Sequence, residues 1–369
     1  MDWTAKMREL GEDFAKRAAK HDEEDSFVAE SYAKLKEVGA LAAGVPKELG
    51  GGDASHAELC GMIRELAHHC SSTALAFSMH THLVATLAYL WRAGNKGPEG
   101  MLKRVAAENL VLISTGGSDW LPGSGKLEKV EGGFRMTGRK IFGSGVPAGD
   151  VLMTTGIYDD PSTGPTVIHF PIPLEAQGVK ILDTWRAHGM RGTGSHDVLL
   201  ENVFIPDAAM GGVRRPPGKW HPFMHAVATV AIPVFYAAYL GVAESARDLA
   251  LKLAQPKKND AFVQHLAGEM ENHLVTAQIA HASMLDLVKT EKLGPATTSA
   301  QLARRHILAD AVIRTVEKAM ETVGGMSFYR SAGLERAWRD IQGARFHPVQ
   351  DKPQTRLTGR HVLGLEIDF

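Results

Sequence analysis

Apolar positions in the first 110 residues recur with the 3.6-residue period of amphipathic helices. The clearest stripe begins near the N-terminus, has charged residues on its other faces, and consists of Trp3, Met7, Leu10, Phe14 and Ala18. Similar patterns cover residues 32–38, 59–66 and 72–91, and Gly39 and Gly94 follow two of them. Because glycine commonly terminates helices, we predict a helical region over residues 1–110.

Near Val111 the period of the pattern shifts from 3.6 to 2. Stretches that alternate or run apolar occupy residues 132–142, 166–173 and 197–206, separated by turn residues. This spacing predicts the strands of a small barrel or sandwich over residues 111–215. It argues against a doubly wound nucleotide-binding sheet, because the helical crossovers that a parallel sheet requires are missing.

Helical periodicity returns after residue 221 and continues to about residue 323. The longest apolar stretch, residues 226–242, is interrupted by Pro233 and is too short to span a membrane, so we predict a buried helix. Residues 216–369 are therefore expected to form a second helical region with a tail.

Composition and charge narrow the possible functions. The chain has 369 residues, of which 44% are hydrophobic and 22% charged, as in a protein that is folded nearly throughout. Its 41 basic and 42 acidic residues leave a net charge of −1. No overall field is available to attract nucleic acid or an anionic membrane.

The cysteines and the N-terminus indicate the compartment. Cys60 and Cys70 are too few for a disulfide framework or a thiolate metal site, and their apolar neighbours favour buried free thiols. The N-terminal sequence is acidic and amphipathic, without the basic and apolar regions of a signal peptide. We therefore expect a cytoplasmic protein.

Several motifs of other enzyme classes are incomplete. The glycines of residues 189–195 lack the G-x-G-x-x-G order of a dinucleotide site, and residues 123–126 lack the first glycine of a P-loop. None of the serines in glycine-rich segments has the flanking glycines of a hydrolase nucleophile elbow. His80 and His82 are two residues apart, so on a helix their rings point to different faces, and no metal site is expected.

Four segments carry a more specific signal when they are taken in chain order. They are I-S-T-G-G-S-D at 113–119, the G-G-F-R-M-T-G-R-K-I-F-G-S-G segment that begins at 132, the H-G-M-R-G-T-G-S segment that begins at 188, and V-G-G-M-S-F-Y-R-S-A-G-L-E-R-A-W-R-D at 323–340. Together they resemble the acyl-CoA dehydrogenase superfamily over almost the whole chain. The resemblance implies an α+β fold with an all-α N-terminal domain, a small β domain and a C-terminal four-helix bundle.

The resemblance also implies the reaction and the flavin contacts. Members of this superfamily typically oxidise an acyl-CoA at its CH–CH position, transfer a hydride to FAD and pass electrons to an electron-transfer flavoprotein. Phe142 and Ser144 occupy the positions of the family's aromatic and hydroxyl flavin contacts, and Thr115 and Ser118 those of the first loop. The alternative for Phe142 is an aromatic residue of the β core.

Further implications concern assembly and the form of the flavin. Gly324 and Gly325 would approach the cofactor of a neighbouring subunit, which implies a homotetramer or at least a dimer. The stretch after Asp248 is shorter than is usual in the family, which weakens the expectation of tightly bound FAD. FMN or loosely held reduced flavin therefore remains an alternative.

His347 stands where the family usually has its catalytic glutamate, and residues 216–242 contain no Asp or Glu that could replace it. Histidine can act as an acid or base near neutral pH, so His347 is the candidate catalytic residue. Together with the segment from Trp185, it also resembles the flavin-dependent monooxygenases of this fold. These take reduced flavin from a separate reductase and oxygenate aromatic or heterocyclic substrates. The remaining alternatives are that His347 only orders the tail and that the protein is noncatalytic.

Overall fold

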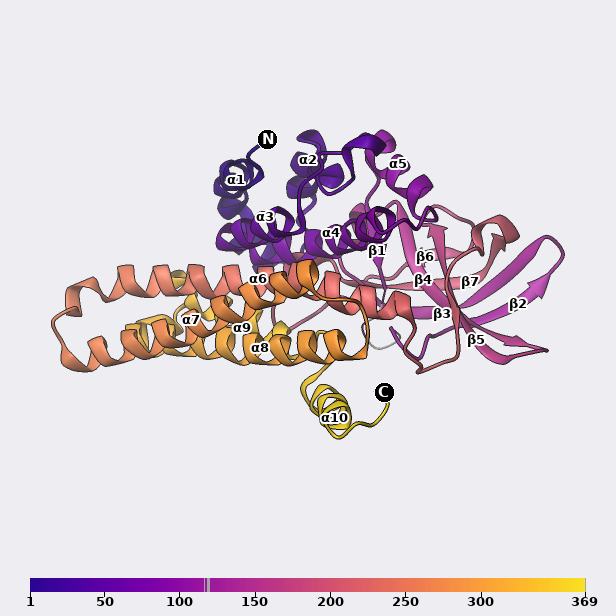
Figure 1. Cartoon of the computed structure of the whole chain (residues 1–369). Helices are drawn as coiled ribbons and strands as arrows, with labels where there is room; N and C mark the ends of the chain where they lie inside the picture. The colour runs from indigo at the N-terminus through magenta and orange to yellow at the C-terminus, as the bar shows by residue number, and fades with distance from the viewer. Residues whose placement is uncertain (116, 118–119, 369) are drawn as a thin grey trace.

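The computed structural model describes residues 1–115, 117 and 120–368, with helices at both ends of the chain and strands between them (Figure 1). This mixed α+β arrangement confirms the expected order of elements. The N-terminal helices are α1 (Trp3–Glu23), α2 (Ala29–Glu37), α3 (His56–His69), α4 (Ser71–Arg92) and α5 (Glu99–Glu108).

Local signals explain where two of these helices begin. The Asp2 side chain accepts a hydrogen bond from the Ala5 amide at the start of α1. Ser55 and Glu58 form a reciprocal capping box at the start of α3. Such caps satisfy amide groups that the first helical turn leaves without partners.

The strands form one mixed sheet in the order β6-β7-β3-β2-β4-β5-β8, with β1 pairing parallel to β4. Three of the expected stretches fall in β3, β5 and β7, which confirms them as strands. Among the described residues the sheet is open, with β6 and β8 at its ends, so a closed barrel is not confirmed. The strands are β1 (Leu112–Ser114), β2 (Lys126–Val130), β3 (Gly133–Gly143), β4 (Val151–Asp160), β5 (Gly164–Pro173), β6 (Val179–Ile181), β7 (His196–Pro206) and β8 (Arg214–Arg215).

The C-terminal region contains three long helices that lie side by side, and α10 packs against one of them, α8, near the end of the chain (Figure 1). Because α9 has only 8 residues, a bundle of four long helices is not confirmed. The helices are α6 (Pro222–Ala254), α7 (Ala261–Thr290), α8 (Pro295–Val323), α9 (Leu334–Ile341) and α10 (Asp351–Val362).

Helix α6 forms the centre of the molecule. It packs against α3 and α4 on one side and α7 and α8 on the other, and one hydrophobic cluster joins all three regions of the chain. It runs for 33 residues, extends beyond the apolar stretch at both ends, and continues through Pro233. By length and composition it could cross a membrane, but 94% of its most apolar window is buried in the protein. The expected buried helix is thus confirmed.

Two side chains from neighbouring helices keep α6 intact at Pro233. Proline has no N–H to donate to the Thr229 carbonyl one turn earlier. The Gln301 amide of α8 donates to that carbonyl at 3.0 Å, and His281 of α7 is hydrogen-bonded to the Pro233 carbonyl at 3.0 Å. The buried aromatic residues that follow Pro233 are therefore held on a continuous helix.

Candidate functional site

The segment between α9 and α10 brings His347 against α6. Its imidazole is partly buried, and its ring centroid lies 5.0 Å from that of Phe235 and 5.4 Å from that of Tyr239. The Tyr239 hydroxyl is 3.1 Å from Nδ1 of His347. The predicted catalytic residue is thus enclosed by aromatic side chains of the central helix.

Arg305 of α8 fixes the backbone on which His347 is carried. This arginine is fully buried and donates hydrogen bonds of 2.9 Å to the carbonyls of Ala344 and His347. A second nitrogen pairs with Asp351 at 2.8 Å. A buried guanidinium requires such partners, and here they anchor the tail to the helices.

A second histidine, His82 of α4, faces the same site. Its Nε2 is 3.2 Å from the Ser114 hydroxyl, and its ring lies 5.9 Å from Phe235. Its Nδ1 is buried and has no hydrogen-bond partner among the described residues. Our sequence analysis missed His82 as a site residue, because its partners come from a distant strand and helix.

His80, the other histidine of that pair, has a structural environment instead. Its Nε2 donates to the Leu41 carbonyl at 2.9 Å, and the Leu112 amide donates to its Nδ1 at 3.0 Å. Only a neutral ring can make both bonds. The two histidines face different partners, as the spacing predicted, and the described residues contain no group that could hold a metal ion.

Both site histidines are uncharged at neutral pH. Burial lowers the pKa of His347 to about 3, and the positive charge of Arg305 adds to this effect. Burial also lowers the pKa of His82 to about 3. Neutral imidazoles of such low basicity accept protons poorly but can still donate or accept hydrogen bonds.

The first predicted flavin loop lies beside the tail that carries His347. Thr115 is hydrogen-bonded to Thr154 of β4 through their hydroxyls at 2.9 Å. An ideal Cβ built on Gly117 would lie 3.1 Å from the Pro348 ring, so this loop and the tail are in close contact. Ser118, the other predicted contact of the loop, lies outside the described residues.

The end of β3 borders the same region. An ideal Cβ on Gly143 would lie 2.9 Å from the Ile113 side chain, next to Ser114. Phe142 is 37% exposed and its ring lies 4.8 Å from that of Trp185, so it is not a core residue.

Ser144 is buried at this end of the strand. Its hydroxyl accepts a hydrogen bond from the Ser195 hydroxyl at 2.8 Å, and Ser195 is bonded in turn to Thr193 at 2.6 Å. The structure therefore brings Thr115, Phe142 and Ser144 to the same end of the sheet, close to the loop that contacts the tail.

Gly324 and Gly325 lie elsewhere. They begin a short 3-10 turn directly after α8, and ideal Cβ atoms on them would meet nothing within 4 Å. No contact recorded among the described residues joins them to His347. Their approach to a neighbouring subunit stays a prediction.

The Arg-Asp pair of the fourth motif stabilises the fold around the site. Asp340 is buried and accepts hydrogen bonds of 2.5 Å from the Met190 amide and the Ser71 hydroxyl. Arg339 pairs with Asp22 of α1 at 2.6 Å. These contacts join the glycine-rich segment before β7 to α1, α4 and α9.

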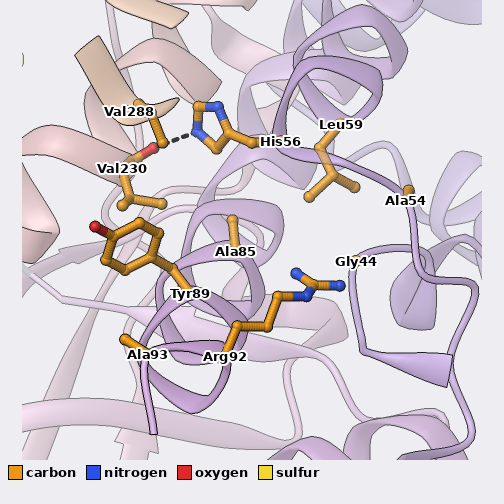
Figure 2. A pocket seen from close by; sticks show the side chains of 10 residues that line it. All are labelled: Gly44, Ala54, His56, Leu59, Ala85, Tyr89, Arg92, Ala93, Val230 and Val288. Atoms are coloured by element: carbon orange, nitrogen blue, oxygen red, sulfur yellow. Dashed lines mark hydrogen bonds between the residues drawn. The ribbon is translucent and has the colours of Figure 1, made fainter. Parts of the chain in front are cut away.

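A cavity of about 340 Å³ lies where α3, α4, α6 and α7 meet (Figure 2). Its walls are mainly apolar, and the polar side chains around it are His56, Tyr89 and Arg92. His56 is hydrogen-bonded to the Val230 carbonyl at 2.8 Å. Ala85 contributes to the wall from α4, one turn after His82, so one face of α4 carries both the site histidine and part of the cavity.

Comparisons with known proteins agree with this architecture. Family models of the acyl-CoA dehydrogenase N-terminal and C-terminal domains match residues 4–98 and 234–352. A putative acyl-CoA dehydrogenase, YdbM of Bacillus subtilis (strain 168), is 31% identical over 95% of this chain and 93% of its own length.

Other relatives are oxygenating enzymes by name. A pigment production hydroxylase of Rhodococcus sp. (strain ATCC 21145) is 26% identical over 96% of this chain and 94% of its own. A dibenzothiophene monooxygenase of Mycolicibacterium goodii is 26% identical over 96% of this chain and 92% of its own. The solved structure of KijD3 with FMN and a dTDP-sugar has a TM-score of 0.90 at 24% identity, covering 99% of this chain and 94% of that one, which shows the same fold.

Proposed function

Because this chain belongs to the acyl-CoA dehydrogenase family of flavin-dependent oxidoreductases, we propose that it is a monooxygenase that uses reduced flavin and O₂. The observation that carries the proposal is the setting of His347. Within the described part of the chain, its ring contacts aromatic side chains and its backbone contacts Arg305, and no carboxylate is hydrogen-bonded or ion-paired to it.

This setting suits an oxygenase better than a dehydrogenase. Removal of the α proton of an acyl-CoA requires a base whose pKa lies near the working pH. The pKa of His347 is about 3 because of its burial, so this imidazole is a weak base at that step. A neutral imidazole can instead donate a hydrogen bond to an oxygen atom during oxygen transfer.

The residues of the site fit a flavin. The buried Nδ1 of His82 lacks a partner among the described residues, which suits a polar edge of a bound ring. The exposed face of Phe142 could pack on the ring, and the hydroxyls of Thr115 and Ser144 could hold its polar atoms. When bound, reduced flavin supplies two electrons, so that one atom of O₂ enters the substrate and the other leaves as water.

The form of the cofactor and the partners are part of the proposal. FMN bound to the similar protein KijD3, together with the short segment after Asp248, supports FMN over FAD. A separate flavin reductase would supply it in reduced form. We further propose a cytoplasmic homotetramer in which Gly324 and Gly325 face a neighbouring subunit, since both lie in open space.

The substrate that fits is a small aromatic or heterocyclic molecule. A volume of about 340 Å³ lies at the lower end of the range for ligand pockets, and such pockets are mostly apolar with a few polar groups. The names of the hydroxylase and dibenzothiophene monooxygenase relatives support this class.

The second candidate is an FAD-dependent acyl-CoA dehydrogenase that passes electrons to an electron-transfer flavoprotein. The 31% identity to YdbM supports it. It requires a proton acceptor of ordinary basicity at the site, and His347 does not provide one.

One experiment separates the candidates. Purified protein is supplied with FMN, NADH and a flavin reductase, and oxygenated products of dibenzothiophene and indole are measured. In parallel, protein loaded with FAD is mixed anaerobically with a panel of acyl-CoA thioesters. We expect oxygenated product in the first assay and unbleached flavin in the second. Bleaching by a thioester, without oxygenated product, contradicts the proposal, and no change in melting temperature with either flavin contradicts both candidates.

A further inference from the structure

Two buried tyrosines of α6 lie beside His347, but their hydroxyls have different partners. Tyr236 donates to the Ala344 carbonyl at 2.8 Å. The hydroxyl of Tyr239 lies 3.1 Å from Nδ1 of His347. Both side chains are almost completely excluded from solvent. Of this pair, only Tyr239 contacts the imidazole through a hydrogen bond.

The direction of the Tyr239 hydrogen bond follows from counting donors and acceptors. Burial raises the pKa of Tyr239 well above 10, so its hydroxyl keeps its proton. If Nδ1 of His347 donated to the Tyr239 oxygen instead, the hydroxyl proton of Tyr239 would be buried without an acceptor among the described residues, which is costly. The Gly343 backbone also packs closely against this group, since an ideal Cβ on Gly343 would lie 2.7 Å from the Tyr239 hydroxyl oxygen.

Tyr239 is therefore the donor, and Nδ1 of His347 is the acceptor. A neutral imidazole has one N–H, so the proton must be on Nε2. That nitrogen makes no hydrogen bond within the described chain and is not among the buried atoms that lack a partner, so it remains accessible.

We propose that Tyr239 is a positioning residue that holds His347 in the Nε2–H tautomer and so presents a hydrogen-bond donor to the reaction site. The catalytic meaning of this arrangement rests on the proposed oxygenase function, whereas the tautomer itself does not. The arrangement also explains why His347 is unsuited to proton abstraction, since its accessible nitrogen already carries a proton.

The surroundings of the ring favour the same state. Arg305 holds the His347 carbonyl at 2.9 Å and places a permanent positive charge near the imidazole. A proton on His82 would also oppose a second proton on this ring. Phe235 and Tyr236 complete the contacts with uncharged rings.

The test compares Tyr239→Phe with Tyr236→Phe. Each variant loses one buried hydroxyl and keeps its aromatic ring, but only the first loses a bond to the imidazole. Protein with ¹⁵N-labelled histidine rings is studied by long-range proton–nitrogen NMR without flavin, and the signals that disappear in His347→Gln identify His347. Steady-state kinetics with reduced FMN provides the second measurement.

In the wild-type protein and in Tyr236→Phe we expect an unprotonated Nδ1 and a protonated Nε2. In Tyr239→Phe we expect both tautomers, with kcat lowered about tenfold and KM unchanged, the size expected for one hydrogen bond to a neutral group. A protonated Nδ1 in the wild-type protein, or the same tautomer in Tyr239→Phe, overturns the proposal. If the tautomers are as expected but no variant or wild-type protein forms oxygenated product, the oxygenase function fails and the positioning role of Tyr239 fails with it, while the tautomer assignment stands.

Discussion

The contact between Gln301 and the Thr229 carbonyl predicts that substitutions at positions 301 and 233 are coupled in their effect on the free energy of unfolding. The Gln301 side chain is fully buried on α8, and its amide donates at 3.0 Å to the Thr229 carbonyl, to which Pro233 cannot donate a hydrogen bond. In Gln301→Leu, a side chain of similar size fills the space but cannot donate. The Thr229 carbonyl is then buried without that partner.

The expected cost follows from the loss of this bond. An unsatisfied buried carbonyl costs about 1–3 kcal/mol, and the Gln301 carbonyl oxygen already lacks a partner among the described residues, so its removal offsets part of the loss. We therefore expect Gln301→Leu to lower the free energy of unfolding by about 1–2 kcal/mol. In a Pro233→Ala background, the new amide at position 233 donates to Thr229, and the same change should cost little.

A double-mutant cycle measures this difference. Urea unfolding followed by circular dichroism gives the stability of the wild-type protein, Gln301→Leu, Pro233→Ala and the double variant. We expect a coupling of about 1 kcal/mol between the two positions. An equal cost of Gln301→Leu in both backgrounds would refute the role that we assign to Gln301.

Three further predictions concern pH, the cavity and the buried aspartate. Burial lowers the pKa of His80 from 6.5 to about 4, so its contribution to stability is complete above pH 6.5 and declines as the pH falls toward 4. We expect the free energy of unfolding to fall by about 2 kcal/mol between pH 7 and pH 5 because of this residue. In His80→Gln, urea unfolding should depend less steeply on pH. Ala85→Phe fills the cavity and should raise KM for an aromatic substrate about tenfold without changing FMN affinity, and an unchanged KM would exclude the cavity as the substrate site. Asp340→Ala leaves the Met190 amide and the Ser71 hydroxyl without their acceptor and should destabilise the protein by about 2–4 kcal/mol, measured by urea unfolding, whereas a loss below 1 kcal/mol would contradict this role.

Local patterns in the sequence predicted most of the fold. The helical stripe from Trp3 and the alternating stretches that became β3, β5 and β7 depend on neighbouring residues, which a sequence displays directly. The continuity of α6 through Pro233 could not be predicted in this way, because the missing hydrogen bond is replaced by Gln301 from α8. Such a compensation exists only in the folded chain.

The site shows the same division between local and long-range information. The motif around His347 identified it as a candidate, but its neutral state depends on burial and on Arg305, a residue of a different helix. His82 lies within an apolar helical stretch, and its role became visible only where β1 placed Ser114 beside it. The direction of the Tyr239 bond likewise required the positions of both side chains.

Oxygen isotope labelling tests the proposed oxygenase function most directly. Protein with reduced FMN and an aromatic substrate, dibenzothiophene or indole, is mixed with ¹⁸O₂, and the product is analysed by mass spectrometry. We predict one atom of ¹⁸O in each molecule of product, with formation greatly reduced in His347→Gln. A product without ¹⁸O would contradict the proposal. The proposal would also be contradicted if wild-type protein gave no labelled product but formed an enoyl thioester from an acyl-CoA without oxygen.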